Sequence, residues 1–202
     1  MLELDTSYYR DNELITGIDE AGRGPLAGPL VVAAVTVKTG FTIPGLDDSK
    51  KLTDKKRREL FKIIKENVIA SHIMVISEAE IDEINILAAT MKGMANAWHG
   101  LSTKGKILVD GNRLPEDLKQ ADAEAIVKGD GKVSAIAAAS ILAKVTRDDI
   151  MINLDKEFPE YGFARNKGYG TAEHLKAINT HGITDCHRKT YGPVAQMKLD
   201  IF

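Results

Sequence analysis

The sequence predicts an α/β fold, a sheet covered by helices, on the basis of two observations. Two short apolar runs near the N-terminus, 14–18 and 30–37, have the character of buried strands, and β-branched residues dominate the second. Farther along, strand-like runs alternate with stretches in which apolar residues recur at helical spacing, most clearly over 81–101. Strands alternating with helices are the pattern of an α/β domain. After about residue 155 the remaining signals are helical, which predicts a helical C-terminal part.

The individual elements follow from short-range signals taken in chain order. The predicted strands are 14–18, 30–37, 69–76, 106–110 and 124–128. The predicted helices run from Thr53 through residue 64, from 81 to about 101, from 134 to about 154, and from Thr171 to 179. Thr53 and Thr171 are suited to open their helices because a threonine hydroxyl accepts a hydrogen bond from a first-turn N–H group.

Length and composition are those of one ordinary domain. The chain has 202 residues, of which 44% are hydrophobic and 28% are charged, which is enough for one good core. We therefore expect residues 1–202 to form a single domain with a helical C-terminal subdomain from about residue 155.

Charge places a limit on nucleic-acid binding. The net charge of −2 gives no support for such binding through overall charge, so any such role depends on local basic clusters. One cluster lies in 50–58, and another is spread over Arg165, Lys167, Arg188 and Lys189. From charge alone, the first cluster is better explained as a solvated helix face.

The single cysteine and the lack of long apolar runs indicate the cellular environment. Cys186 has no partner for an internal disulfide, and a cysteine-based zinc site is disfavoured. The first residues lack the charged and apolar regions of a signal peptide, and no run approaches membrane-spanning length. We expect a cytoplasmic protein that acts as a monomer without a membrane.

Four acidic residues share one type of position, at or just beyond the end of a predicted strand: Asp19, Glu20, Asp110 and Asp130. Ligand sites of open α/β sheets form at strand ends, and several carboxylate oxygens suit a hard divalent cation. Asp110 or Asp130 alone is better explained as part of an ordinary glycine turn. Asp19 and Glu20 are harder to explain in that way. Because neighbours in a regular strand face opposite sides, both can serve one site only if the strand ends or kinks there.

Gly22, Arg23 and Gly24 follow these acids after a single alanine. Glycines permit such a kink and let backbone N–H groups approach a ligand, and arginine offers a forked pair of donors to a phosphate. The combination predicts metal-assisted chemistry on a phosphate or sugar phosphate, without identifying the substrate. No HExxH zinc motif, Walker loop or dinucleotide fingerprint competes with it. His187 fits a substrate contact or a structural role.

The segment 17–29, which reads GIDEAGRGPLAGP, resembles the signature of the ribonuclease HII family, the type 2 ribonucleases H. Further blocks typical of the family follow in the expected order: 48–52, 85–91, 109–112, 128–130, 134–148 and 167–171. The resemblance runs from about residue 13 to 194. It departs from the usual pattern before His187 and Arg188, where a proline-containing run is common, and at Tyr191, where Phe is common.

The resemblance implies a ribonuclease H-like fold, with a mixed five-stranded sheet flanked by helices. The first three strands would be antiparallel and the later ones parallel. It implies endonucleolytic cleavage of the RNA strand of RNA–DNA hybrids. It also implies incision 5′ of a single ribonucleotide embedded in duplex DNA, leaving a 3′-hydroxyl and a 5′-phosphate. The expected partners are therefore the hybrid and the ribonucleotide-containing duplex.

The resemblance also assigns roles to residues. Asp19, Glu20, Asp110 and Asp130 match the four metal-binding carboxylates, which would hold two Mg²⁺ ions, with Mn²⁺ as a substitute. Residues 22–24 match the segment that senses the ribose 2′-hydroxyl and the phosphates around the junction. Tyr169 matches the tyrosine that packs on the sugar after the ribonucleotide. We expect Lys50 to contact a backbone phosphate.

Two alternatives stay open. The first is a hybrid-binding module that has lost catalysis, against which the presence of all four acids argues. The second is the type 3 ribonuclease H family, which shares the fold but handles single ribonucleotides poorly. That family usually has an extra N-terminal domain, whereas only about 13 residues precede the first motif here. A duplex with one embedded ribonucleotide separates types 2 and 3, and a nuclease assay with and without EDTA tests for loss of catalysis.

Overall fold

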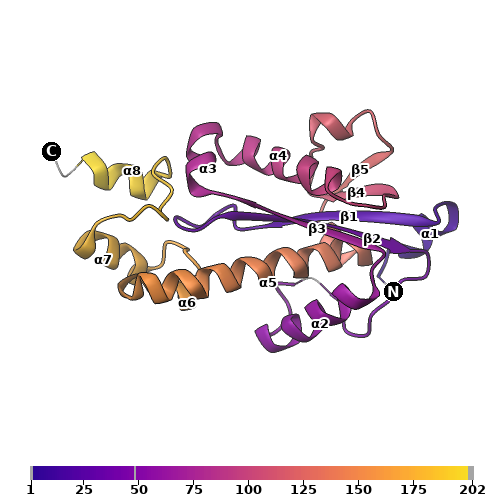
Figure 1. Cartoon of the computed structure of the whole chain (residues 1–202), viewed down its shortest axis with the longest axis horizontal. Helices are drawn as coiled ribbons and strands as arrows, with labels where there is room; N and C mark the ends of the chain where they lie inside the picture. The colour runs from indigo at the N-terminus through magenta and orange to yellow at the C-terminus, as the bar shows by residue number, and fades with distance from the viewer. Residues whose placement is uncertain (1, 48, 200–202) are drawn as a thin grey trace.

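A mixed five-stranded sheet forms the centre of the computed structural model, which describes residues 2–47 and 49–199 (Figure 1). Asp48, the first residue of the family-like block 48–52, lies outside the described residues. The strands are β1 (Leu14–Ala21), β2 (Leu30–Lys38), β3 (Ala70–Ile76), β4 (Lys106–Asp110) and β5 (Ala123–Ile126). Their order in the sheet is β3-β2-β1-β4-β5. The pairs β1–β2 and β2–β3 are antiparallel and β1–β4 and β4–β5 are parallel, which confirms the mixed sheet.

Helices cover both faces of the sheet. The described helices are α1 (Asp5–Asp11), α2 (Asp54–Asn67), α3 (Glu78–Ile84), α4 (Ile86–His99), α5 (Ser134–Glu157), α6 (Phe163–Asn166), α7 (Ala172–His181) and α8 (Gly192–Leu199). In Figure 1, α3 and α4 lie above the sheet, while α5 and α2 lie below it. Each face has its own apolar cluster, built from alternate residues of the central strands. Val35 and Val37 belong to the cluster that includes α5, and Val32 and Ala34 belong to the cluster that includes α4.

Gly17 explains how closely α5 approaches the middle of β1. A Cβ atom at this position would lie 2.2 Å from the main-chain carbon of Ala135, so no other residue fits without displacing the helix. The contact fixes the first turns of α5 against the strand that carries Asp19. The Ala-rich sequence predicted here as helix forms it, and the helix continues beyond the predicted end, to Glu157.

Local capping decides where several helices begin. Thr53 accepts a hydrogen bond from the N–H of Lys56, and Thr171 accepts one from the N–H of His174, as the sequence predicted. The single helix predicted over 81–101 is wrong. Asn85 adopts a positive φ of 66° and divides the segment into α3 and α4, and its side chain caps α4. The side-chain amide oxygen of Asn85 accepts hydrogen bonds from the first N–H groups of α4, so a new helix begins there. Apolar spacing does not reveal this local effect.

After α5, every regular element of the described residues is a helix, which confirms the predicted helical C-terminal part. It has its own apolar cluster, in which Tyr161, Phe163 and Ile178 pack with Met151 of α5 and Leu26 of the segment after β1. The C-terminal part is thereby attached beside the end of β1. Among the described helices, none is long and apolar enough to cross a membrane.

Candidate active site

The strand β1 continues past the two adjacent acids. The strand predicted over 14–18 is longer in the structure, because Asp19 and Glu20 both remain paired with β2, opposite Ala33 and Val32. The pairing of β1 with β4, however, ends at Ile18. One side of the strand is therefore open where the acids lie, and neighbouring residues can border one site without a kink.

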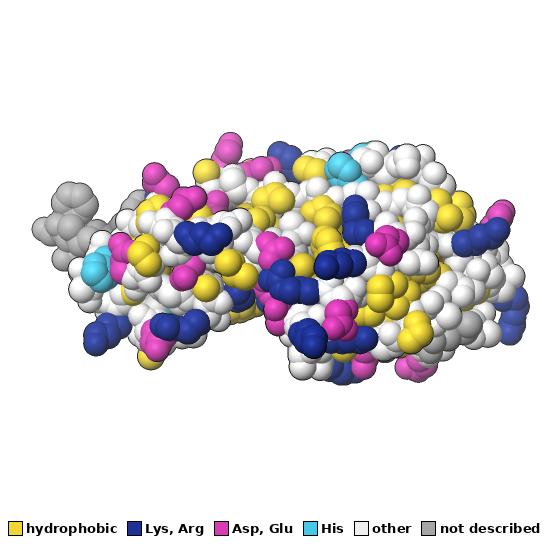
Figure 2. All heavy atoms as spheres, turned by 60° about the horizontal axis from the view of Figure 1, so that its bottom comes forward, with side chains coloured by type: hydrophobic (Ala, Val, Ile, Leu, Met, Phe, Trp, Pro, Cys, Tyr) yellow, Lys and Arg dark blue, Asp and Glu magenta, His cyan; other side chains and the backbone are white. Residues whose placement is uncertain are grey.

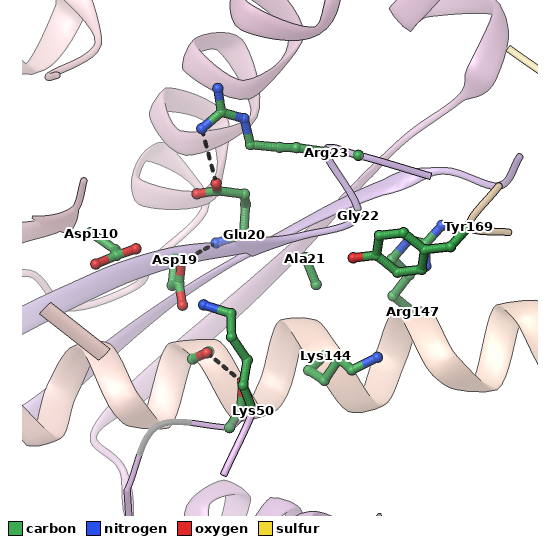
Figure 3. Close-up of a pocket in the computed structure, with 13 residues that line it drawn as sticks. Asp19, Glu20, Ala21, Gly22, Arg23, Lys50, Asp110, Lys144, Arg147 and Tyr169 are labelled. Carbon is green, nitrogen blue, oxygen red and sulfur yellow. Dashed lines mark hydrogen bonds and ion pairs between the residues drawn. The ribbon is translucent and has the colours of Figure 1, made fainter. Parts of the chain in front are cut away.

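Three of the four predicted acids line one pocket (Figure 3). Asp19 is only 3% exposed, and a hydrogen bond with the Ser140 side chain links it to α5. Glu20 also borders a second pocket, on the α4 side of the sheet. Asp110 is the last residue of β4, and its Oδ1 accepts a hydrogen bond from the N–H of Gly129 at 2.6 Å. The carboxylates thus meet at the edge where the parallel strands end.

Asp130 lies beside this pocket and does not line it. It is 4% exposed and belongs to a single 3-10 turn, Gly129–Gly131, that follows β5. Its Oδ2 is 3.2 Å from the Nζ of Lys50, whose side chain reaches across from the loop before α2. The negative charge of Asp130 also raises the pKa of Asp110, after the larger effect of burial, so the two acids interact electrostatically.

Burial and mutual repulsion disfavour the ionised form of these carboxylates. Burial, followed by the charges of Glu20 and Asp110, raises the pKa of Asp19 well above its usual range. Burial also raises the pKa of Glu20, although the charge of Arg23 opposes the rise. The pKa of Asp110 is raised for the same first reason. A divalent cation would reverse this balance by favouring the ionised forms.

The donor set fits a hard divalent cation. It consists of carboxylate oxygens, which Mg²⁺ and Mn²⁺ prefer. Among residues 2–47 and 49–199, no group of three or more Asp, Glu, His or Cys side chains is arranged as it stands to hold a metal ion. Asp19, Glu20 and Asp110 therefore border one space without being gathered around a single point.

The pocket has a volume of about 270 Å³ and contains every predicted site residue except Asp130. Its lining residues are Asp19, Glu20, Ala21, Gly22, Arg23, Gly24, Ser49, Lys50, Asp110, Ser140, Lys144, Arg147 and Tyr169. In Figure 3, the Arg23 side chain points toward Glu20, and their charged atoms are 3.5 Å apart. The Tyr169 ring lies at the other end of the pocket, beside Arg147.

The turn after β1 and the loop that carries Tyr169 are joined through the main chain. The N–H groups of Leu26 and Ala27 both donate to the carbonyl of Gly168, at 2.8 and 3.3 Å. A Cβ atom on Gly24 would lie 3.6 Å from the Tyr169 ring, and Tyr169 is 49% exposed. An exposed aromatic ring therefore lies opposite the glycine turn, although the two segments are far apart in the sequence.

The family model described as Ribonuclease HII matches residues 16–194 of the chain. The chain belongs to the ribonuclease HII family. Curated ribonuclease HII proteins include one from Francisella philomiragia, 52% identical over 90% of this chain and 97% of that protein. Another, from Marinomonas sp., is 52% identical over 94% of each chain. As a member of this family, the protein is a metal-dependent endoribonuclease that acts on the RNA strand of RNA–DNA hybrids.

Solved structures agree with the ribonuclease HII assignment. The crystal structure of ribonuclease H2 from Pyrococcus horikoshii superposes with a TM-score of 0.78 at 27% identity, over 93% of this chain and 98% of that one. The ribonuclease HII of a PCNA complex from Archaeoglobus fulgidus gives 0.72 at 28% identity, over 89% and 95%. A Bst-RNase HIII structure with Mn²⁺ gives 0.72 at 18% identity, over 93% and 70%, which shows the shared fold alone.

Some residues of this ribonuclease HII pocket were not predicted as site residues. Ser140 and Lys144 share one face of α5, a spacing that the sequence shows without distinguishing a structural pair from a site. The Nζ of Lys144 lies 2.6 Å from a carboxylate oxygen of Asp148, which is buried, so such a pair exists beside the pocket. Nothing local in the sequence indicated Arg147, because its contacts are with distant main-chain carbonyls.

The structure shows which residues of the predicted basic clusters are exposed and which are buried. Arg188 is fully buried, so it does not belong to an exposed basic cluster with Arg165, Lys167 and Lys189. On the face shown in Figure 2, Lys and Arg side chains are interspersed with acidic ones. His187 is fully buried against His174, which supports the structural role over a substrate contact.

Proposed function

We propose that this protein incises duplex DNA on the 5′ side of a single embedded ribonucleotide, in addition to cleaving hybrids, and leaves 3′-hydroxyl and 5′-phosphate ends. The observation that carries the proposal is the composition of one pocket. Buried carboxylates with raised pKa values border the same space as a glycine turn and an exposed tyrosine ring. The carboxylates suit cleavage, and the turn and ring suit recognition of a ribose beside DNA.

Asp19, Glu20, Asp110 and Asp130 would hold two divalent ions, Mg²⁺ or Mn²⁺. Bound there, the ions supply activation of the attacking water and stabilisation of the leaving 3′-oxygen. The Gly129 N–H donates to one oxygen of Asp110 and so fixes the orientation of this carboxylate. Lys50 is placed beside Asp130, with most of its side chain exposed, where it can also meet a backbone phosphate.

Recognition of the ribose is assigned to the turn and to Tyr169. The 2′-hydroxyl is the group that distinguishes RNA from DNA, and backbone groups of Gly22, Arg23 and Gly24 can bond to it. The Tyr169 ring offers a flat surface to the following sugar. We also propose that the protein works as a single catalytic domain, as a monomer and in the cytoplasm.

A duplex with one embedded ribonucleotide tests the proposal. With Mg²⁺, the strand should be cut at the phosphodiester on the 5′ side of the ribonucleotide, and EDTA should abolish cleavage. An all-deoxy duplex of the same sequence is the matched control and should stay intact. Tyr169→Ala should lower incision at the single ribonucleotide by about tenfold, the upper end of what one aromatic packing contact contributes. Cleavage of hybrids without incision of the embedded ribonucleotide would contradict the proposal and favour type 3 behaviour.

A further inference from the structure

Two arginines are buried behind the glycine turn without a carboxylate partner. Arg147 is 1% exposed and Arg188 is 0% exposed. Within the described part of the chain, neither forms an ion pair with an acidic side chain. Burial lowers the pKa of Arg147 to about 10 and also lowers that of Arg188, which shows how costly the site is for a cation. Buried arginines are usually paired, so this arrangement requires another explanation.

Main-chain carbonyl groups, rather than carboxylates, accept the hydrogen bonds of both arginines. Arg188 donates to the carbonyls of Gly22 at 2.6 Å, Arg23 at 2.9 Å and Gly28 at 2.7 Å. Arg147 donates to those of Ala27, Pro29 and Lys167, at 3.0, 2.9 and 2.9 Å. All of these carbonyls belong to 22–29 except that of Lys167, which belongs to the loop that carries Tyr169. The two guanidinium groups therefore hold the inner side of the turn.

The direction of these carbonyls determines the direction of the neighbouring N–H groups. In a trans peptide, the C=O of one residue and the N–H of the next point in opposite directions, and the described residues contain no cis peptide. Because the carbonyls of Gly22 and Arg23 face Arg188, the N–H groups of Arg23 and Gly24 face the open side of the turn. In the described part of the chain, neither N–H donates a hydrogen bond to another protein group.

We propose that Arg188, supported by Arg147, is a positioning residue that aims the N–H groups of Arg23 and Gly24 at the ribose and its adjacent phosphate. The inference depends on the proposed function of the turn. A guanidinium bonded to a carbonyl polarises that peptide, which makes the N–H on its far side a better donor. The two buried positive charges also attract a phosphate on the open side.

Tyr191 adds a donor to the same arrangement. Its hydroxyl donates to the carbonyl of Arg23 at 2.7 Å and accepts from Arg188 at 3.0 Å. The carbonyl before the Gly24 N–H is therefore held by two side chains. Tyr191→Phe removes the hydroxyl without removing the ring, which makes it a mild test of the same arrangement.

Binding measurements test the role of Arg188. With Ca²⁺ in place of Mg²⁺ to prevent cleavage, the Kd is measured for a duplex with one ribonucleotide and for the all-deoxy duplex. We expect Arg188→Lys, which keeps the charge but loses the fork, to lower the ratio of the two affinities by about tenfold, the effect of one well-placed hydrogen bond to a charged group. We expect Tyr191→Phe to lower it by about two- to threefold.

The ratio separates positioning from general stability. A merely structural defect would lower the folded fraction and weaken both duplexes equally, leaving the ratio unchanged. Arg58→Lys is the matched control, because Arg58 pairs with Asp54 and Asp149 away from the turn, and its ratio should equal that of the wild type. An unchanged ratio in Arg188→Lys overturns the inference.

Two further outcomes of the binding measurements would also decide the inference. If Arg188→Lys does not fold, Tyr191→Phe decides, and an unchanged ratio in that variant overturns the inference. If the wild type itself does not prefer the ribonucleotide duplex, the proposed function fails and the inference fails with it. A wild-type preference that Tyr169→Ala reduces but Arg188→Lys does not would leave the proposed function standing without the role of Arg188.

Discussion

Gly22 and Gly24 lie two residues apart, and a methyl group at each would meet different surroundings. Gly22 has a φ of 100°, and a Cβ atom there would lie 2.1 Å from Nε of Arg147 and 2.8 Å from the carbonyl oxygen of Pro29. Gly24 has no positive φ, and its Cβ would reach only the Tyr169 ring, at 3.6 Å. The first glycine is required by the fold, while the second leaves room between the turn and the ring.

We therefore expect the two alanine variants to fail in different ways. Gly22→Ala should lower the free energy of unfolding by about 2–4 kcal/mol, because it combines backbone strain with a clash. Gly24→Ala should change stability by less than about 1 kcal/mol and should still reduce incision at an embedded ribonucleotide. Chemical denaturation and single-turnover cleavage measure the two effects. Equal losses of stability would contradict this distinction.

We expect Asp110 to be required for activity although it does not stabilise the folded protein. Since burial raises its pKa, the ionised carboxylate is less stable in the folded protein than in the unfolded chain near neutral pH. Asp110→Asn should lower kcat by about 100-fold or more, as loss of a catalytic electrostatic group does. It should leave duplex binding intact and stability equal or higher. Near-normal turnover with Mg²⁺ would exclude Asp110 as a metal ligand.

At the scale of elements, α7 is tied to the segment before Arg188 by a directed chain of hydrogen bonds. The N–H of Thr184 donates to Nδ1 of His187, so the proton of neutral His187 is on Nε2. This Nε2 faces Nε2 of His174 at 3.1 Å, and Nδ1 of His174 faces the carbonyl of Tyr169 at 2.9 Å. Since the chain begins at an obligatory donor and ends at an obligatory acceptor, both rings must be neutral.

The neutral histidines predict a dependence of stability on pH. Burial lowers the pKa of His187 from 6.5 to about 4, and burial also lowers the pKa of His174. The unfolded chain binds these protons more readily than the folded protein does. Stabilisation by neutral His187 is therefore complete above about pH 6.5 and is lost as pH falls toward 4, by roughly 2–3 kcal/mol.

Urea denaturation at about pH 7.5 and about pH 5 measures this loss, since the two values lie on either side of the ordinary histidine pKa. The carboxylates with raised pKa values act in the opposite direction, so wild type is compared with His187→Gln, which shares them. The wild type should lose more stability than the variant on acidification. An equal loss in both would show that His187 does not titrate in this way.

Elements with a strong local pattern were predictable from sequence, and those set by distant contacts were not. The threonine caps at 53 and 171 and the strand Lys106–Asp110 follow from adjacent residues alone. The division between α3 and α4 depends on one asparagine with a positive φ, which apolar spacing does not record. β1 extends to Ala21 because β2 continues to pair with it, a long-range effect that outweighs two charged residues.

In the site too, features set by adjacent residues were predictable and those set by distant contacts were not. The residues that lie close in sequence, such as the acids of β1 and the turn after them, were identified directly. The supporting role of the two arginines was missed because their partners are carbonyls, which every residue carries and no sequence pattern marks. The pairing of Asp130 with Lys50 was also missed, since it joins residues 80 positions apart.

At the scale of the whole molecule, divalent cations should stabilise the folded protein. The buried carboxylates repel one another, and a cation that binds only the folded state removes this repulsion. Mg²⁺ at about 100 times its Kd should add about 2.7 kcal/mol of stability. Thermal denaturation with Mg²⁺ and with EDTA measures the shift in Tm. Asp110→Asn should show a smaller shift, and an identical shift would place the stabilising ion elsewhere.

The hydrogen bond between Arg188 and the carbonyl of Gly22 joins residues 166 positions apart. A chain made from its N-terminus completes β1, β4 and α5 before Arg188 leaves the ribosome. Contacts of such long range form late, because closing the intervening loop is slow. The carboxylates can therefore gather before the turn is aimed. Arg188 is synthesised after all four carboxylates, so it can bond to the turn only once they are already part of the chain.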